Sequence, residues 1–169
     1  MQTENETHSI PHCPRLLILG IGNLLMGDEG LGVHLAQRLE GRELPPGIAV
    51  LDGGTGGFHL MPYFEEYPCL IMIDATLDER PPGTIRLLQP RFAADFPRAM
   101  STHDIGLRDL VEGLHILGRL PRIHLFVVSI AELQDMYIGL SPAIEAVLPE
   151  LEEQVLELAQ GLLQECGIQ

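Results

Sequence analysis

Lysine is absent from this chain of 169 residues, and all ten of its basic residues are arginine. Its absence excludes Schiff-base chemistry and phosphate binding by the lysine of a Walker-type loop. The arginines are outnumbered by 24 acidic residues, which gives a formal net charge of −14. Because nucleic-acid binding needs clustered positive charge, no nucleic acid is expected as a partner.

Cysteine is also scarce. The three cysteines are Cys13, Cys69 and Cys166, and no two of them form a CxxC pair. An odd number without that spacing indicates neither a disulfide framework nor a structural zinc site, so a reducing cytoplasm is the expected location. Cys69 falls within an apolar run and is interpreted as inert core.

Long apolar segments are missing as well. No stretch reaches the ~18 apolar residues of a membrane-spanning helix, so no membrane association is expected. Residues 1–14 are polar and lack the pattern of an export signal, and we predict a disordered tail there. The remainder, residues 15–169, is predicted to form a single domain, because 46% hydrophobic content is enough for one core.

Four short apolar runs are typical of strands buried on both faces. They cover residues 15–20, 48–52, 69–74 and 121–129, and residues 84–88 are predicted to form a further strand at an edge, possibly antiparallel. Helical periodicity is found between them. It predicts helices after Asp28, which could cap the first of them, through residues 58–67, behind a capping box at residues 101–104, and from Ser141 onward, where Pro149 should kink or split the helix.

Alternating strands and helices predict the α/β class, with a mostly parallel sheet covered by helices on both faces. Binding sites in such folds lie beyond the carboxyl ends of the strands. Glu29 follows the first predicted strand, Asp52 ends the second and Asp74 ends the third. His103, at the start of a helix, can join them at that edge.

Glu29, Asp74 and His103 together offer two carboxylates and one imidazole, a set suited to a borderline divalent ion such as nickel or zinc. Each also has a simpler explanation. Glu29 could complement a helix dipole, Asp74 could cap a turn, and His103 could belong to the capping box. Their convergence on one sheet edge favours the metal-contacting interpretation.

The glycine-rich turn from Gly20 to Gly27 resembles a dinucleotide-binding loop, but Leu25 stands where the third glycine of GxGxxG belongs. The turn could shape a site, or could simply allow the backbone to pass closely from strand to helix. Both interpretations stay open.

Other polar residues are weaker candidates. Ser101 is explained by capping, and no GxSxG motif accompanies it. The acidic residues of the C-terminal helix are interpreted as a solvated face; they are Glu145, Glu150, Glu152, Glu153, Glu157 and Glu165. Structural or exposed roles are expected for His8, His12, His34, His59, His115 and His124.

Several motifs occur in the order and spacing of one known family. Residues 20–33 read GIGNLLMGDEGLGV, residues 51–57 read LDGGTGG, residues 73–75 read IDA and residues 101–107 read STHDIGL, and residues 140–144 read LSPAI. Together they resemble the hydrogenase maturation proteases over about residues 16–163. Each motif alone is weak, but their combination is specific.

The resemblance implies a three-layer α/β/α sandwich with a mostly parallel central sheet. It implies an endopeptidase, of the aspartyl type, whose metal-contacting and catalytic residues are Glu29, Asp74 and His103. The implied substrate is the nickel-loaded large-subunit precursor of a [NiFe] hydrogenase, which loses its C-terminal tail. Nickel would thus be recognised in the precursor rather than held permanently by the enzyme.

We further expect Asp52, Gly53, Gly54, Thr55 and Gly56 to shape the cleft that receives the tail, because glycine permits close approach of another backbone. A monomer that meets its substrate transiently is expected. Two other functions are consistent with parts of the sequence: a non-catalytic nickel checkpoint or chaperone, and a Rossmann-like nucleotide-binding oxidoreductase. A different protein substrate is a further possibility, since a spore protease shares this general fold.

Overall fold

Five strands form one sheet in the order β2-β1-β3-β5-β4. The computed structural model of the chain describes residues 16–97 and 104–165, so the predicted disordered tail, residues 1–14, lies outside the described residues. The strands are β1 (Leu16–Gly20), β2 (Ile48–Asp52), β3 (Cys69–Thr76), β4 (Ile85–Leu88) and β5 (Arg122–Ser129). Neighbouring strands are parallel except for β4, which pairs antiparallel with β5 at the edge, as predicted.

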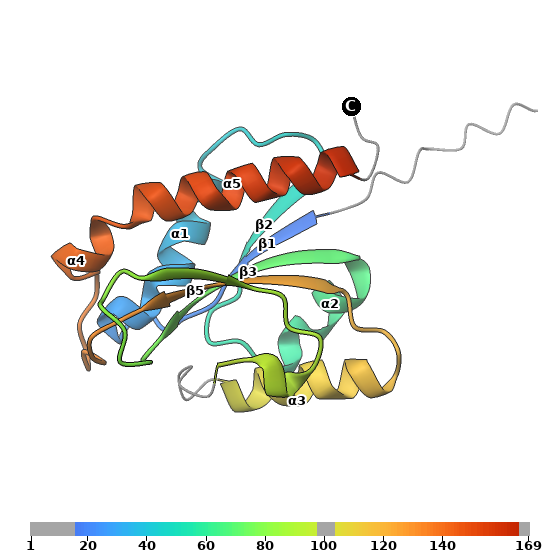
Figure 1. Cartoon of the computed structure of the whole chain (residues 1–169), viewed down its shortest axis with the longest axis horizontal. Coiled ribbons are helices and arrows are strands. Elements are labelled where there is room, and N and C mark those ends of the chain that lie inside the picture. Colours follow the sequence, from blue (N-terminus) through green and yellow to red (C-terminus); the bar gives the residue numbers. More distant parts are fainter. Residues whose placement is uncertain (1–15, 98–103, 166–169) are drawn as a thin grey trace, which may run out of the picture.

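Helices cover both faces of the sheet, which confirms the predicted three-layer architecture (Figure 1). The α-helices are α1 (Leu31–Glu40), α2 (Met61–Glu66), α3 (Asp104–Ile116), α4 (Pro142–Glu145) and α5 (Leu148–Glu165). Short 3₁₀ helices are η1 (Gly27–Gly30), η2 (Phe58–Leu60) and η3 (Ala93–Asp95).

Alternation along the strands sends side chains into two separate cores. Leu16 and Ile18 of β1 pack with α1 and α5, whereas Leu17 and Leu19 pack with α2 and α3. Successive strand residues point to opposite faces, so a strand covered on both sides must be apolar throughout. This requirement explains why the sequence shows continuous apolar runs.

The connections that follow the parallel strands emerge at one edge of the sheet, which we call the carboxyl edge. In Figure 1 the connections after β3 and β5 reach this edge at the left. Register aligns Gly20 of β1 with Asp52 of β2 and with Ile73 of β3, so these strands end close to one another. Residues immediately after them are therefore brought together.

Several predicted boundaries differ in detail. Strand β3 continues two residues beyond Asp74, because β5 pairs with it as far as Thr76. Helix α3 ends at Ile116, so Leu117 lies after the helix and is exposed. The C-terminal region does split just before Pro149, into α4 and α5. Within the described residues, no helix is both long and apolar enough to cross a bilayer.

The acidic face predicted for the C-terminal helix is wrong at Glu152. Its side chain is buried, and it receives ion pairs from Arg38 Nε at 2.8 Å and Arg42 Nη1 at 2.7 Å. A buried carboxylate needs such partners to offset its lost hydration. Glu152 therefore joins α5 to α1 and to the turn that follows α1.

Candidate active site

The turn after β1 is held between the ends of β2 and β3. The Ile21 N–H donates to the Ile73 carbonyl at 2.9 Å, and the Gly22 N–H donates to the Gly54 carbonyl at 2.8 Å. The Gly53 N–H in turn donates to the Gly20 carbonyl at 2.8 Å. These bonds extend the sheet pairing beyond the strands and position the chain that enters η1.

Glycines in this turn are required by close backbone contacts. A Cβ on Gly20 would lie 2.0 Å from the Gly32 carbonyl oxygen, and one on Gly22 would lie 2.1 Å from the Glu29 carbonyl oxygen. Gly32, at the start of α1, lies equally tightly against Ile73 and Ile21. The glycines thus let the first helix approach the strand ends. This agrees with the interpretation that the turn allows the backbone to pass closely from strand to helix.

Glu29 and Asp74 are both buried at the carboxyl edge. Glu29 is in η1, which packs against β3, the strand that carries Asp74. Asp74 Oδ1 accepts a hydrogen bond from the Ala75 N–H at 2.7 Å. Two carboxylates that are far apart in the sequence are therefore buried in neighbouring elements. The low dielectric of such a site strengthens the attraction between a carboxylate and any bound cation.

The third predicted residue, His103, lies outside the described residues. Helix α3 begins at the next position, Asp104, and a Cβ on its Gly106 would lie 3.1 Å from the Gly57 Cα. The first turn of α3 thus abuts the loop after β2. Among residues 16–97 and 104–165, no three His, Cys, Asp or Glu residues are grouped closely enough to hold a metal ion.

Asp28 does not cap α1, contrary to the prediction. The residue before α1 is Gly30, and it makes no side-chain cap. Instead the buried Asp28 carboxylate accepts a hydrogen bond from the Ser141 N–H at 2.6 Å, and the Asp28 N–H donates to Gln134 Oε1 at 2.9 Å. Asp28 therefore ties η1 to the loop between β5 and α4, more than 100 residues away in sequence.

The loop after β2 exposes backbone at the same edge. Asp52 Oδ1 accepts a hydrogen bond from the Gly54 N–H at 2.9 Å, and Oδ2 accepts one from Gln37 Nε2 at 3.0 Å. Gly54 and Gly56 have positive φ values of 53° and 75°, and Thr55 between them is exposed. The side chain of Asp52 therefore supports a loop in which Thr55 is exposed and Gly54 and Gly56 are partly exposed.

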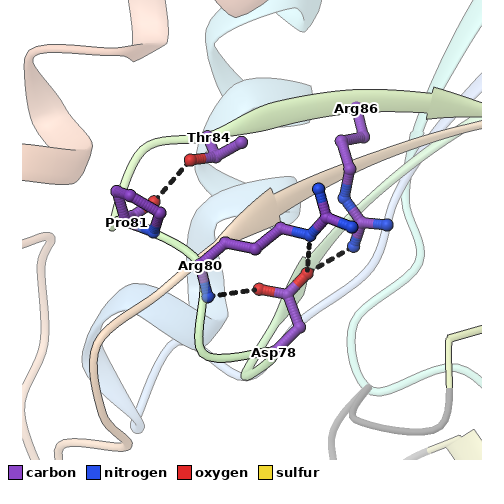
Figure 2. Close-up of polar contacts among 5 residues, drawn as sticks. All are labelled: Asp78, Arg80, Pro81, Thr84 and Arg86. Carbon is purple, nitrogen blue, oxygen red and sulfur yellow. Dashed lines mark hydrogen bonds and ion pairs between the residues drawn. The ribbon is translucent and has the colours of Figure 1, made fainter.

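A charged cluster after β3 was not anticipated from the sequence. Asp78 forms ion pairs with Arg86 and, at 3.5 Å, with Arg80 (Figure 2). Burial alone would raise the pKa of Asp78, but the nearby Ser129 hydroxyl, the hydrogen bond from the Arg80 N–H and the charges of Arg86 and Arg80 together lower it. The sequence feature that could have indicated this cluster is the Asp-Glu-Arg run at residues 78–80, just before the turn at residues 81–83.

Register relates this cluster to the site. Asp74 of β3 and Arg86 of β4 are both aligned with Val127 of β5, so one strand separates them. Residues aligned across a sheet project from the same face. The arginine of the cluster is therefore a cationic neighbour on the sheet face that carries Asp74.

Comparisons with known proteins identify the family. A sequence model described as hydrogenase maturation protease matches residues 33–158. The hydrogenase 2 maturation protease of Escherichia coli strain K12 is 36% identical over 158 residues, which cover 92% of this chain and 94% of the relative. This chain belongs to the hydrogenase maturation protease family. It is accordingly a peptidase, and not the nucleotide-binding oxidoreductase that the glycine turn alone had suggested.

Solved structures of family members share the fold. The hydrogenase maturating endopeptidase HybD from E. coli superposes with a TM-score of 0.76 at 36% identity, covering 90% of this chain and 94% of that one. The [NiFe] hydrogenase maturation protease HybD from Thermococcus kodakarensis gives a TM-score of 0.68 at 28% identity, covering 86% and 99%. The architecture is thus that of the maturation proteases along almost the whole chain.

Proposed function

We propose that this maturation protease removes a C-terminal extension from the nickel-loaded large-subunit precursor of a [NiFe] hydrogenase. The observation that carries the proposal is the pair of buried carboxylates, Glu29 and Asp74, at the carboxyl edge of a maturation protease fold. Burying carboxylates costs free energy, which a bound cation can offset. Nickel in the precursor supplies that cation.

In this proposal Glu29, Asp74 and His103 contact the nickel of the substrate and make up the catalytic centre. Two carboxylate oxygens and one imidazole nitrogen suit a borderline ion. Three protein ligands leave coordination positions open for a water molecule or for cysteine thiolates of the precursor. The metal then bridges enzyme and substrate, and without it the carboxylates would repel the thiolates.

The extended tail of the precursor is proposed to enter beside residues 52–56. The exposed Thr55 and the partly exposed Gly54 and Gly56 offer backbone that another chain can approach. Asp52 holds this loop through Gly54. We propose that the enzyme acts as a single domain and as a monomer in the cytoplasm, and binds the precursor only transiently.

The test uses purified enzyme and precursor from nickel-starved cells, with and without restored nickel. Tail removal, followed by mass spectrometry, should occur only with nickel. Glu29→Gln, Asp74→Asn and His103→Ala should each reduce the cleavage rate by at least about 100-fold, because each removes a metal-contacting group. Circular dichroism should show that all three variants stay folded.

Two outcomes would contradict the proposal. Efficient cleavage of the nickel-free precursor in the presence of a chelator would show that the enzyme reads the peptide alone. Tight binding of the nickel-loaded precursor without any cleavage would instead identify a checkpoint or chaperone. A matched control is Glu65→Gln, whose exposed carboxylate pairs with Arg119 at 3.2 Å and should be dispensable for cleavage.

A further inference from the structure

Hydrophobic side chains gather on the loop between β5 and α4 and on the turn beside it. Met136 and Ile138 are 82% and 73% exposed, and Tyr137 and Leu25 are each about half exposed. We call these four residues the hydrophobic loop patch. Large apolar side chains that face water in a group mark an interaction site more often than scattered ones do.

Backbone hydrogen bonds fasten the patch to the rest of the fold. The Gly27 N–H donates to the Tyr137 carbonyl at 2.8 Å, and the Tyr137 N–H donates to the Leu25 carbonyl at 3.1 Å. These bonds pair the two segments like parallel strands, with a bridge between Met26 and Tyr137. The loop is therefore fastened to the turn that leads into η1.

Asp28 fastens the same loop at two further points, through Gln134 and Ser141. Between these points Met136 has a φ of 54°, in the left-handed region that costs a non-glycine residue ~1 kcal/mol or more. Such strain persists only where surrounding contacts impose it. The fold thus maintains a strained backbone that presents an apolar side chain to solvent.

Exposed apolar side chains are concentrated at the carboxyl edge. In the part of the chain that the structure describes, eleven large hydrophobic residues are exposed, and seven of them lie at this edge, six on loops and one at the start of η2. The patch contributes four, and Leu133, Leu77 and Phe58 are the others. Leu25 of the patch stands two residues before η1, which carries Glu29, so the patch lies beside the turn that leads to the proposed catalytic centre.

We propose that the hydrophobic loop patch docks an apolar segment of the large-subunit precursor that also carries basic side chains. The inference rests on the proposed function and specifies how the substrate is recognised. Glu132 and Asp135 are exposed within the same loop, so the patch is apolar with a negative border. A basic and apolar segment complements such a surface.

Charge also argues against other occupants. A second copy of this chain would bring another net charge of −14 to a surface that is already acidic, and like charges oppose association. Anionic membranes and nucleic acids are disfavoured for the same reason. Because the patch lies beside the proposed catalytic centre, the substrate protein is the partner that we propose for it.

The test compares steady-state cleavage of nickel-loaded precursor by two double variants. Met136→Asn with Ile138→Ser removes apolar surface, and asparagine tolerates the left-handed conformation at position 136. Ile116→Ser with Leu117→Ser is the matched control, because both residues are highly exposed but lie at the opposite edge of the sheet. We expect KM to rise about tenfold for the patch variant with kcat within twofold, and no change for the control.

The measurements separate this proposal from the function on which it rests. If wild-type enzyme fails to cleave nickel-loaded precursor, the proposed function fails. If it cleaves and the patch variant has an unchanged KM, only the docking proposal fails. Sedimentation of the wild type adds one check: a dimer that the patch variant no longer forms would identify a second copy as the occupant and overturn the proposal.

Discussion

We assign different roles to the adjacent acidic residues Asp28 and Glu29. Asp28 and Glu29 are both buried, yet the Asp28 carboxylate is engaged by the Ser141 N–H and the Gln134 side chain. Glu29 belongs to the proposed catalytic centre. The difference follows from the 3₁₀ helix, which turns neighbouring side chains in different directions. Mutating Asp28 would therefore disturb the loop that carries the hydrophobic patch.

His124 provides a prediction about pH and stability. It is buried in β5, and neither ring nitrogen has a hydrogen-bond partner. Burial lowers the pKa of His124, the charge of Arg122 lowers it further, and Glu165 opposes them. Below a pH of ~6.5 the unfolded chain therefore binds a proton that the folded chain does not, and stability falls as pH falls.

We expect His124→Leu to reduce the loss of unfolding free energy between pH 7 and pH 5, by at most about 1.4 kcal/mol per pH unit. Urea denaturation at several pH values measures this. His59→Gln, at an exposed position, is the control and should keep the wild-type slope. An unchanged slope in the His124 variant would mean that this imidazole is protonated in the folded protein.

At the scale of elements, the position of α1 depends on Gly32. A Cβ there would lie 2.2 Å from the Ile73 carbonyl oxygen and 2.3 Å from that of Ile21, so both strand ends would have to move. In α3, by contrast, a Cβ on Gly113 would meet no atom within 4 Å. The same substitution should therefore have opposite effects in the two helices.

Gly32→Ala should destabilise the protein by about 2 kcal/mol or more, because overpacking displaces backbone. Gly113→Ala should stabilise it by about 0.5–1 kcal/mol, because alanine loses less conformational entropy in a helix. Thermal unfolding of both variants measures the difference. Equal effects would show that the close approach of α1 to β1 and β3 is not maintained in solution.

The loop after β2 offers a second prediction at this scale. Gly54 has a φ of 53°, and an added Cβ would meet no atom within 4 Å. Gly54→Asn should therefore fold almost normally, whereas Gly54→Val should lose about 1–3 kcal/mol of stability through backbone strain. Urea denaturation of both variants distinguishes the cost of backbone strain at a positive φ from the cost of a steric clash.

If this loop receives the tail of the substrate, Gly54→Asn should raise KM for cleavage although its stability is nearly unchanged, because a side chain would occupy the space of the approaching backbone. If the asparagine variant cleaves the substrate with the wild-type KM, the loop is only a turn between strand and helix and does not receive the tail. The asparagine substitution is informative because its effect on activity is not mixed with unfolding.

At the scale of the whole molecule, the residues that stabilise the fold and the residues proposed to bind substrate occupy different parts of the sheet. Two apolar cores occupy its faces, whereas Glu29, Asp74 and most of the exposed large apolar side chains among the described residues lie along its carboxyl edge. Parallel connectivity imposes this division, because the four parallel strands β1, β2, β3 and β5 all end at the same edge. The family's activity can thus depend on loops while the layers remain constant.

The sequence alone determined the layers, because strand and helix formation depends on local apolar periodicity that can be read directly. It also predicted that Glu29 and Asp74 would reach one edge, since parallel strands end together. Tertiary structure alone decided which partners meet across long sequence separations. Examples are Asp28 with Gln134 and Ser141, and Glu152 with Arg38 and Arg42. Local patterns carry no record of such pairings, because they depend on which loops and helices pack against each other once the sheet has formed.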